Sequence, residues 1–202
     1  TWAVGDSPFH VIGNVLVTTG VTLTIEAGVE VKFDSGTYIK VEGDLIADGT
    51  SSDGIVFTSS SESPSAGDWD SIRIRPTSGT TFDGNYNYVS GTIFDYVTVK
   101  YASTGLDVDD TGLLVTNSSF QSNSTAMSMS GTENMIITSN TFDNNSSYGI
   151  SSSGSSENTQ ISNNVFSNNR SAVQLGSVFE SLDIVNNEFA NNEMGLLLGG
   201  TV

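Results

Sequence analysis

The sequence contains no cysteine and only one histidine, His10. Disulfide bonds, thiolate metal sites and cysteine nucleophiles are therefore excluded, and so is a metal site built from several imidazoles. No hydrophobic run approaches the length of about 18 residues that a membrane-spanning helix requires, so we expect no membrane insertion.

Positive charge is also scarce. Six Lys and Arg residues stand against 23 Asp and Glu residues, which gives a formal net charge of −17. Such a charge repels nucleic-acid backbones and anionic lipids, so neither is expected as a partner. Neutral glycans, cations and surface proteins remain as expected partners. Charged residues make up 14% of the chain, against about 25% in an average protein, so the surface must be covered by neutral polar side chains.

The second half of the chain repeats one pattern every 19 to 24 residues. Each copy contains an aromatic residue, found at Tyr101, Phe120, Phe142, Phe166 and Phe189. Five residues before each aromatic lie Tyr96, Val115, Ile137, Ile161 and Ile184. A period of this length, with short alternating runs and no helical periodicity, indicates that each repeat is one coil of a solenoid.

These repeats predict an all-β fold, a parallel β-helix with three strands in each coil and about 8 to 9 coils. Identical residues at one phase of a solenoid lie above each other at the strand spacing of about 4.8 Å. One buried column is therefore expected to contain Phe120, Phe142, Phe166 and Phe189. A hydrogen-bonded asparagine ladder is expected at Asn140, Asn164 and Asn187. In this interpretation Asn164 also occupies the left-handed bend between two strands.

The first half of the chain has longer strands in which apolar and polar residues alternate, for example at 29–33 and 39–42. Residues 1–20 are interpreted as an N-terminal cap and first coil, and residues 76–92 as a loop inserted into one coil. No linker divides the chain, so residues 1–202 are expected to form a single domain. Because the chain begins at Thr1 and not at Met, we expect it to be a piece of a longer protein.

A family resemblance is carried by three segments, residues 20–33 (GVTLTIEAGVEVKF), 39–43 (IKVEG) and 67–69 (GDW). They resemble the N-terminal coils of right-handed parallel β-helix repeat proteins from bacterial and archaeal cell surfaces. The later coils are similar to the right-handed β-helix region of the pectate-lyase-like superfamily. The resemblance implies right-handed coils. It also implies that, in the enzymes of this superfamily, catalysis takes place on the outer face of the first sheet.

The outward side chains of that first sheet, coil by coil, are expected to be Arg73, Asp107, Ser128, Ser151, Gln174 and Leu197. A glycoside hydrolase needs two carboxyl groups, and a lyase needs a base beside a cation. This column contains one carboxylate, and we interpret Arg73 and Asp107 as a cross-strand ion pair. No catalytic residue is therefore predicted, and His10 is expected to be a surface or cap residue.

The residues Asp107, Asp109 and Asp110 place three carboxylates beside a turn. Calcium binds six to eight oxygen atoms, and alternate Asp side chains together with turn carbonyls can supply several of them. This segment is the candidate calcium site, and the alternative is an ordinary acidic turn. No other cofactor is expected.

In the inserted loop, Tyr86 and Tyr88 alternate with Asn85 and Asn87. Exposed aromatic rings have an apolar face that can stack on sugars, and loops on rigid scaffolds are common binding sites. The two tyrosines are therefore the candidate glycan-binding residues. The alternative is a loop that packs on its own coil through its aromatic side chains.

Taken together, these features predict a non-catalytic, extracellular β-helix module of a cell surface, adhesin or matrix, which binds a glycan or calcium. The alternative is a carbohydrate-active domain, similar to a polysaccharide lyase or glycoside hydrolase, whose catalytic residues lie outside this piece. The open ends of a solenoid also offer a route to self-association, and the oligomeric state stays open.

Overall fold

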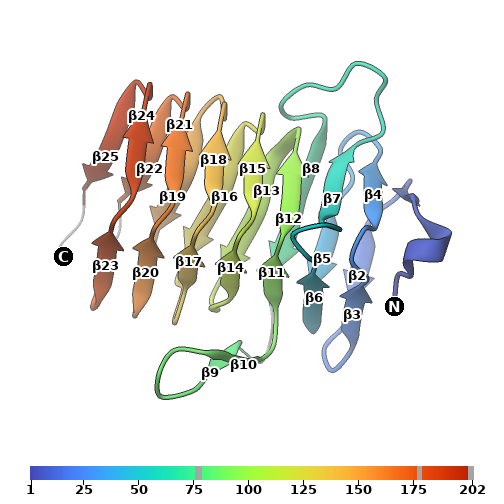
Figure 1. Cartoon of the computed structure of the whole chain (residues 1–202), viewed down its shortest axis with the longest axis horizontal. Helices are drawn as coiled ribbons and strands as arrows, with labels where there is room; N and C mark the ends of the chain where they lie inside the picture. The colour runs from blue at the N-terminus through green and yellow to red at the C-terminus, as the bar shows by residue number, and fades with distance from the viewer. Residues whose placement is uncertain (76–78, 177–178, 200–202) are drawn as a thin grey trace.

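The computed structural model describes residues 1–75, 79–176 and 179–199. It is a parallel β-solenoid of about eight coils, and each complete coil contributes one strand to each of three sheets (Figure 1). In the described part of the chain the only helix is the short 3₁₀ helix η1 (Val4–Asp6), and no helix there is long and apolar enough to cross a membrane. The predicted all-β solenoid with three strands per coil is confirmed.

We name the three sheets A, B and C in the order in which a coil enters them. Sheet A is formed by β3 (Thr22–Ile25), β6 (Asp44–Asp48), β11 (Ile93–Asp95), β14 (Leu114–Thr116), β17 (Ile136–Thr138), β20 (Thr159–Ser162) and β23 (Leu182–Val185). Sheet B is formed by β1 (Phe9–Val11), β4 (Glu30–Phe33), β7 (Ile55–Ser59), β12 (Val97–Lys100), β15 (Ser119–Gln121), β18 (Thr141–Asp143), β21 (Val165–Ser167) and β24 (Glu188–Ala190). Sheet C is formed by β2 (Val15–Val17), β5 (Ile39–Val41), β8 (Trp69–Ile74), β13 (Ala102–Asp109), β16 (Thr125–Ser130), β19 (Tyr148–Ser153), β22 (Ser171–Leu175) and β25 (Met194–Leu198).

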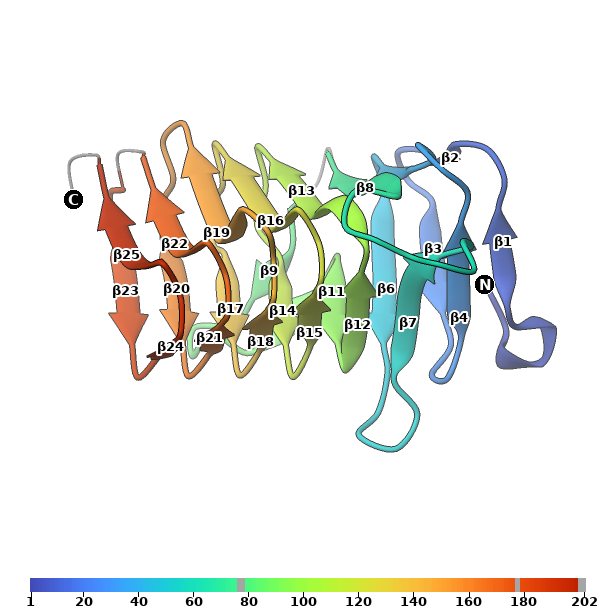
Figure 2. The same cartoon turned by 90° about the horizontal axis from the view of Figure 1, so that it is seen from above.

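The coils stack along one axis, as the view from above shows (Figure 2). Along each strand, residues alternate between the interior and the outer face, so each sheet has one buried face and one that turns outward. Parallel pairing in register then lines up equivalent residues of successive coils in columns. The interior of the solenoid is a continuous apolar core that runs from Val11 to Phe179.

The phenylalanine column follows the predicted register. Phe120, Phe142 and Phe166 are fully buried, and neighbouring rings are stacked with centroids 5.2 and 4.7 Å apart. Phe189 continues the stack at 5.3 Å. The prediction that Phe189 is buried is wrong, because it lies in the last coil that the structure describes and is 38% exposed.

The predicted register of the first repeat is wrong, because Tyr96 and Tyr101 do not occupy the positions equivalent to Val115 and Phe120. Val99, and not Tyr101, pairs with Phe120, and Phe94, and not Tyr96, pairs with Val115. Both tyrosines have positive φ, 49° at Tyr96 and 68° at Tyr101, which places them at the corners between sheets. Both tyrosines are half-buried, and Tyr101 packs against the core without joining the column.

The asparagine ladder is confirmed, and it begins at Ser118. Asn164 Oδ1 accepts hydrogen bonds from the backbone N–H of Asn140 (2.9 Å) and from its Nδ2 (3.0 Å), and Asn187 does the same for Asn164. The left-handed bend is not at Asn164. It is at the preceding residue, Asn163 (φ 56°), which turns its side chain outward and so lets Asn164 point inward.

A second asparagine ladder, which was not predicted from the sequence, lies at the corner between sheets B and C. It consists of Asn123, Asn145, Asn169 and Asn192. The Asn-Asn pairs at 144–145, 168–169 and 191–192 are the sequence pattern that indicates this ladder. In each pair the first Asn takes the left-handed bend outside the coil and the second enters the ladder.

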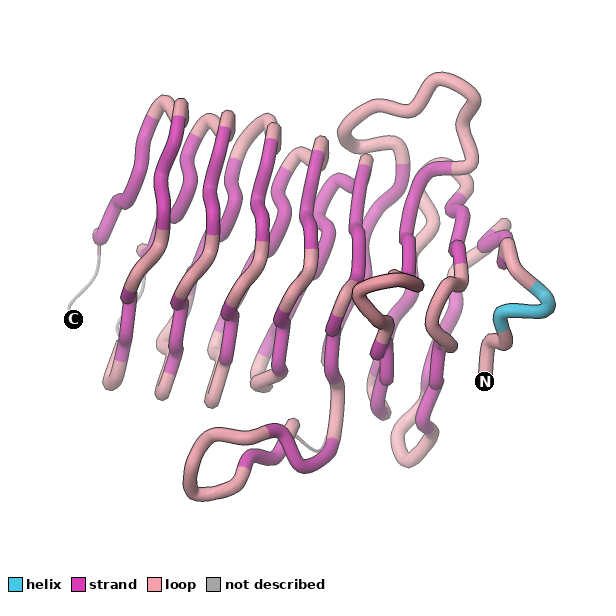
Figure 3. Tube along the Cα trace, viewed as in Figure 1, coloured by secondary structure: helices cyan, strands magenta, loops and turns pink. Residues whose placement is uncertain are grey.

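The inserted loop predicted at 76–92 leaves the solenoid after sheet C and forms a small antiparallel hairpin, β9 (Thr81–Phe82) and β10 (Tyr88–Ser90). Its first residues, 76–78, lie outside the described residues. The hairpin projects from one side of the coil stack (Figure 3). At its base Gly91 has a φ of 103° and a Cβ there would meet Thr80 Cα at 2.7 Å, so this position requires glycine.

Candidate functional site

The outer face of sheet A carries an apolar column where a solvated face would normally be polar. Successive coils place Ile46, Ile93, Leu114 and Ile136 in register. The column then becomes polar at Gln160 and Asp183. Although Ile93 and Ile136 face outward, each is only 6% exposed. The β9–β10 hairpin lies against this face, since Tyr86 of the hairpin and Ile136 line the same pocket.

The β9–β10 hairpin has a fixed tip. The carboxylate of Asp83 accepts hydrogen bonds from the backbone N–H groups of Asn85 (2.8 Å) and Asn87 (2.9 Å) and from the side chain of Asn87 (2.9 Å). These bonds, that of the Asn87 side chain first, lower the pKa of Asp83. The tip holds Tyr86 in the left-handed region (φ 63°) with its side chain 66% exposed. A rigid and exposed aromatic ring is thus presented by the hairpin.

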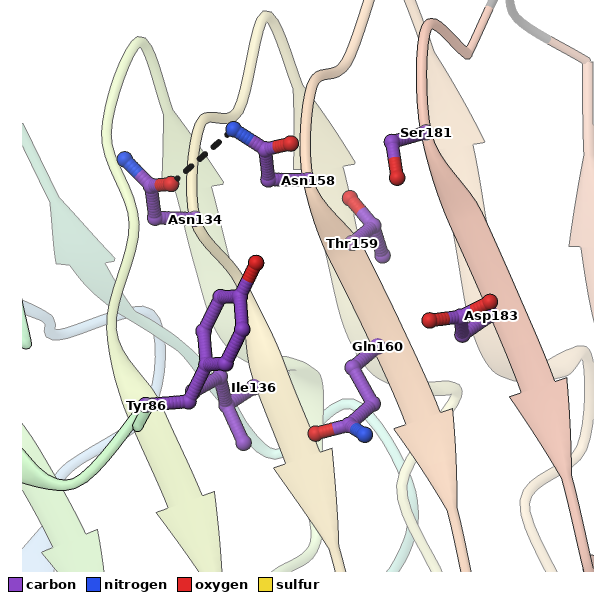
Figure 4. Close-up of a pocket in the computed structure, with 8 residues that line it drawn as sticks. All are labelled: Tyr86, Asn134, Ile136, Asn158, Thr159, Gln160, Ser181 and Asp183. Atoms are coloured by element: carbon purple, nitrogen blue, oxygen red, sulfur yellow. Dashed lines mark hydrogen bonds between the residues drawn. The ribbon is translucent and has the colours of Figure 1, made fainter. Parts of the chain in front are cut away.

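A pocket of about 70 Å³ lies between this ring and sheet A (Figure 4). Its lining combines Tyr86 and Ile136 with polar groups from three neighbouring coils. The polar lining residues are Asn134, Asn158, Thr159, Gln160, Ser181 and Asp183. The pocket therefore has an apolar part beside a rim of amide, hydroxyl and carboxylate groups.

The polar rim is only partly engaged in internal hydrogen bonds. Asn158 Nδ2 donates to Asn134 Oδ1 at 3.2 Å, which orients both amides (Figure 4). The hydroxyl of Thr159 is buried and has no hydrogen-bond partner among the residues that the structure describes. A buried hydroxyl without a partner costs about 1–3 kcal/mol, so this group marks a place where the packing of sheet A is not fully satisfied by the described residues.

The two predicted glycan-binding tyrosines have different surroundings. Tyr86 lines the pocket, whereas the half-buried Tyr88 is outside its lining and donates its hydroxyl proton to Gly91 O at 2.7 Å. Burial, with smaller contributions from Asp44 and Asp48, raises the pKa of Tyr88. Glycan binding by either residue stays a prediction.

The predicted calcium residues face an arginine. Arg75 Nη2 lies 2.6 Å from Asp107 Oδ2, and Arg75 Nε lies 3.3 Å from Asp109 Oδ2. Asp110 is exposed, with a φ of 54°. Within residues 1–75, 79–176 and 179–199, no group of three or more His, Asp or Glu side chains is arranged to hold a metal ion. Calcium binding stays a prediction, and the guanidinium of Arg75 would compete with the ion for these carboxylates.

The outward column of sheet C has the predicted register, from Arg73 through Asp107, Ser128, Ser151 and Gln174 to Leu197. The predicted ion pair between Arg73 and Asp107 is wrong. Arg73 pairs with Asp70 and lies 3.9 Å from the ring centroid of Tyr38, while Asp107 pairs with Arg75. Arg73 thus pairs within its own strand, β8, whereas Arg75, just beyond the end of β8, contacts two carboxylates of the neighbouring β13.

We refer to the charged residues on the outer face of β5, β8 and β13, with Glu42 just beyond β5 and Arg75 just beyond β8, as the sheet C charge cluster. It consists of Lys40, Glu42, Asp70, Arg73, Arg75, Asp107 and Asp109. The column predicted from the sequence contains only one carboxylate, because the other charged side chains of this face lie beside that column. The cluster thus holds carboxylates and cations together, where the expected column held one pair.

The single histidine is exposed, as predicted. His10 Nε2 lies 2.7 Å from Asp34 Oδ1, and the hydroxyl of Ser60 donates to the same oxygen. The hydrogen bond from Ser60, followed by that from His10, lowers the pKa of Asp34.

A pair of neighbouring carboxylates predicts a pH-dependent contribution to stability. Asp48 and Asp95 are direct neighbours on β6 and β11, and burial, followed by repulsion from Asp95, raises the pKa of Asp48. A raised pKa means that the folded state binds the proton more tightly, so stability falls as the pH rises through this range. Asp48→Asn is therefore expected to raise the free energy of unfolding at pH 7 by a few tenths of a kcal/mol.

Urea unfolding at a series of pH values measures this effect. The advantage of Asp48→Asn should shrink as the pH falls toward 3, where the carboxyl is protonated in both states. Glu62→Gln removes a charge from an exposed loop residue and is the control. An advantage that is independent of pH, or equal in the control, would contradict the assignment.

Comparison with protein-family models gives the classification. The model described as the right-handed β-helix region matches residues 65–202, and the model described as the pectate-lyase-like β-helix domain matches residues 4–86. The chain therefore belongs to the right-handed β-helix family, which confirms the predicted fold and resemblance. No curated protein and no solved structure gives a significant match.

Proposed function

We propose that this chain is a non-catalytic, extracellular β-helix module that binds a neutral glycan at the Tyr86 pocket. The observation that carries the proposal is the ring of Tyr86 held over the outer face of sheet A beside the polar side chains that line the same pocket. An aromatic face takes up the apolar face of a sugar ring, and amide, hydroxyl and carboxylate groups bond to its hydroxyls.

The charge of the chain supports a neutral ligand. The net charge is −17, and Asp183 at the pocket rim adds a local negative charge. Polyuronates and other acidic polysaccharides would be repelled unless a cation bridges them. A role at a cell surface, in an adhesin or in a matrix agrees with this chemistry and with the surface proteins that the sequence resembles. Calcium at Asp107, Asp109 and Asp110 is a subsidiary part of the proposal.

Tyr86→Ala is the direct test of the glycan site. Binding of neutral oligosaccharides is first located on a glycan array and then measured by isothermal titration calorimetry. Loss of one stacked aromatic ring is expected to weaken binding about tenfold, which corresponds to about 1.4 kcal/mol. Val89→Ala changes a 61% exposed residue of the same hairpin outside the pocket lining and should bind as the parent chain does. Equal affinity of Tyr86→Ala and the parent would refute the site.

A second candidate function is favoured by the sheet C charge cluster. Carboxylates and cations lie together there on an outer sheet face, which is a combination that carbohydrate-active enzymes use. Each of the aspartates in the cluster, however, already forms an ion pair with an arginine, so a substrate would have to displace that arginine to reach the carboxylate.

Enzyme activity separates the two functions. The non-catalytic proposal expects no release of reducing ends or unsaturated uronides from neutral or acidic polysaccharides. Turnover that disappears in Asp107→Asn and in Arg73→Ala would establish the carbohydrate-active alternative. The same variants should leave glycan binding at Tyr86 unchanged, because the Tyr86 pocket draws no lining residue from sheet C.

A further inference from the structure

The N-terminal end of the solenoid is covered by the chain itself. Trp2 forms a parallel bridge with Ile25 at the edge of sheet A, and its ring stacks on that of Phe9 with the centroids 5.0 Å apart. Val11 and Val17, the last residues of β1 and β2, are only 4% and 5% exposed. The first coil therefore keeps these core side chains out of water.

The C-terminal end is open in the part of the chain that the structure describes. Phe189, Leu196 and Leu198 continue inward columns that are buried in the preceding coil, yet they are 38%, 44% and 45% exposed. Leu198 belongs to the same column as Val17, so this column is covered at its first member and uncovered at its last. Burying such an apolar end removes hydrophobic surface from water and drives association.

This end is also an edge of three strands. β23, β24 and β25 are the last described strands of the three sheets, and each pairs with the preceding coil on one side (Figure 2). In that preceding coil, the backbone N–H groups of Asn164 and Asn169 donate forward, to Asn187 (3.0 Å) and Asn192 (2.9 Å). Because the coils repeat, the N–H groups of Asn187 and Asn192 point the same way, toward the end. Such an edge is a template for pairing with another strand edge.

We propose that the open end binds the same end of a second copy of this chain, across a two-fold axis that passes through Leu196 of β25. A two-fold axis perpendicular to the solenoid axis makes the two β25 strands antiparallel and uses one surface twice. Leu196 then faces Leu196 of the second copy, and Met194 faces Leu198. The inference does not depend on the glycan site at Tyr86.

The sequence of β25 suits pairing with itself. Side chains alternate along a strand, so Met194, Leu196 and Leu198 share one face and are placed symmetrically about the middle residue. The same axis exchanges sheets A and B, which lays β23 of one copy over β24 of the other and brings Ile184 toward Phe189 of the second copy. All of these inward contacts are apolar, so the end is complementary to itself.

A head-to-tail stack fits less well. The phenylalanine column that ends at Phe189 begins at Phe9, and Phe9 already has the ring of Trp2 against it. The end of a second copy would have to displace Trp2 to continue that column. The two-fold contact requires no such change, and it closes after two copies, whereas a head-to-tail contact adds copies without limit.

Acidic side chains surround the open end and predict how salt acts on the dimer. Asp183, Glu188 and Glu193 are exposed residues of the last coil, and Arg170 faces Glu193 at 3.9 Å. The two-fold axis brings Asp183 of one copy toward Glu188 of the other, so like charges oppose an apolar contact. Raising the NaCl concentration from 0.1 M to 1 M shortens the Debye length from about 10 Å to about 3 Å and screens this repulsion.

Sedimentation equilibrium of the full chain over a wide range of concentrations is the first measurement. The weight-average mass is expected to rise from that of the chain, 21.2 kDa, toward twice this value and no further. The dissociation constant should fall at least threefold between 0.1 M and 1 M NaCl. A monomer at every concentration and both salt levels would overturn the inference, and so would masses that grow beyond the dimer.

Leu196→Asp and Leu16→Asp form the matched pair of variants. Leu196→Asp places two carboxylates against each other at the axis and should weaken the dimer at least tenfold. Leu16→Asp makes the same change at the opposite end of the solenoid, where Leu16 is 53% exposed, and should stay within twofold of the parent. Equal weakening by the two variants would indicate a head-to-tail contact and would overturn the inference. Thermal melts show whether both variants are folded.

A cysteine at the axis tests the geometry even if Leu196→Asp does not fold. Opposed residues of antiparallel strands have Cα atoms about 4.5–5.5 Å apart, which is within the range of a disulfide bond. The chain contains no other cysteine, so Leu196→Cys should form a disulfide-linked dimer in oxidised glutathione, while Leu16→Cys should not. Absence of this dimer for Leu196→Cys, or an equal yield from Leu16→Cys, would overturn the two-fold arrangement.

Discussion

Replacing Phe166 by alanine is expected to lower the free energy of unfolding by about 3–5 kcal/mol. The ring is fully buried and lies between those of Phe142 (4.7 Å) and Phe189 (5.3 Å). Its Cδ1 also approaches Gly149 so closely that a Cβ there would lie 3.0 Å away. Backbone hydrogen bonds fix the spacing of the coils, so the neighbouring coils cannot collapse into the cavity.

The measurement is the urea midpoint and slope followed by circular dichroism. Phe189→Ala is the matched control, because it removes the same ring from the same column at a position that is 38% exposed. It should cost clearly less, since much of that ring already contacts water. Equal losses in the two variants would show that burial does not set the contribution of each ring.

The repeat period accounts for the part of the fold that the sequence predicts well. In a solenoid, every coil must satisfy the same packing and hydrogen-bonding requirements, so residues such as Phe142 and Phe166 recur at one phase. The outward column of sheet C follows from the same logic, because alternation within a strand fixes which side chains face out.

The errors in the predicted register arise where residues of similar chemistry have different backbone conformations. Tyr101 resembles the core aromatics, yet it occupies the left-handed corner, and the bulk at that phase of the core comes from Val99. The Asn-Asn pairs show the reverse case. Two identical residues, such as Asn144 and Asn145, have opposite environments, since one is exposed and the other is buried in the second ladder.

Most of the candidate site could not be read from local patterns. The alternation of sheet A marks Gln160 and Asp183 as outward residues, but nothing near them shows that the hairpin of Tyr86 lies against that face. The partners of the arginines were equally hidden. The strand register predicts which Cα atoms are neighbours. A long and flexible arginine side chain, however, can reach several carboxylates, and the alternative ion pairs differ little in free energy.

Asn164→Ala is expected to destabilise the chain by about 2–6 kcal/mol, because it leaves two buried backbone groups without partners at about 1–3 kcal/mol each. These groups are the N–H of Asn140, which Asn164 Oδ1 accepts at 2.9 Å, and the carbonyl of Ile137, to which Asn164 Nδ2 donates at 2.9 Å. Asn164 is only 1% exposed, so water cannot replace either bond without entering the core.

The neighbouring residue supplies the control. Asn163→Ala alters an exposed side chain and costs only the left-handed strain of a non-glycine residue, about 1–2 kcal/mol. Asn163→Gly, which relieves that strain, should be close to neutral or stabilising. If Asn163→Ala were as damaging as Asn164→Ala, the bend and not the ladder would hold this corner.

Asn164→Asp distinguishes the loss of the Nδ2 hydrogen-bond donor from the loss of side-chain volume, because Asp is nearly the same size as Asn. The carboxylate keeps the acceptor for Asn140 but cannot donate to Ile137, and burial should raise its pKa because the charged form is poorly solvated there. A group with a raised folded pKa stabilises the fold below that pKa and loses this contribution as the pH rises through it. The stability deficit of Asn164→Asp relative to the parent should therefore be largest at pH 7 and shrink on acidification, where the neutral acid can donate to Ile137. The deficit of Asn164→Ala has no such titration and should stay constant, and parallel pH profiles for the two variants would refute the role of the Nδ2 donor.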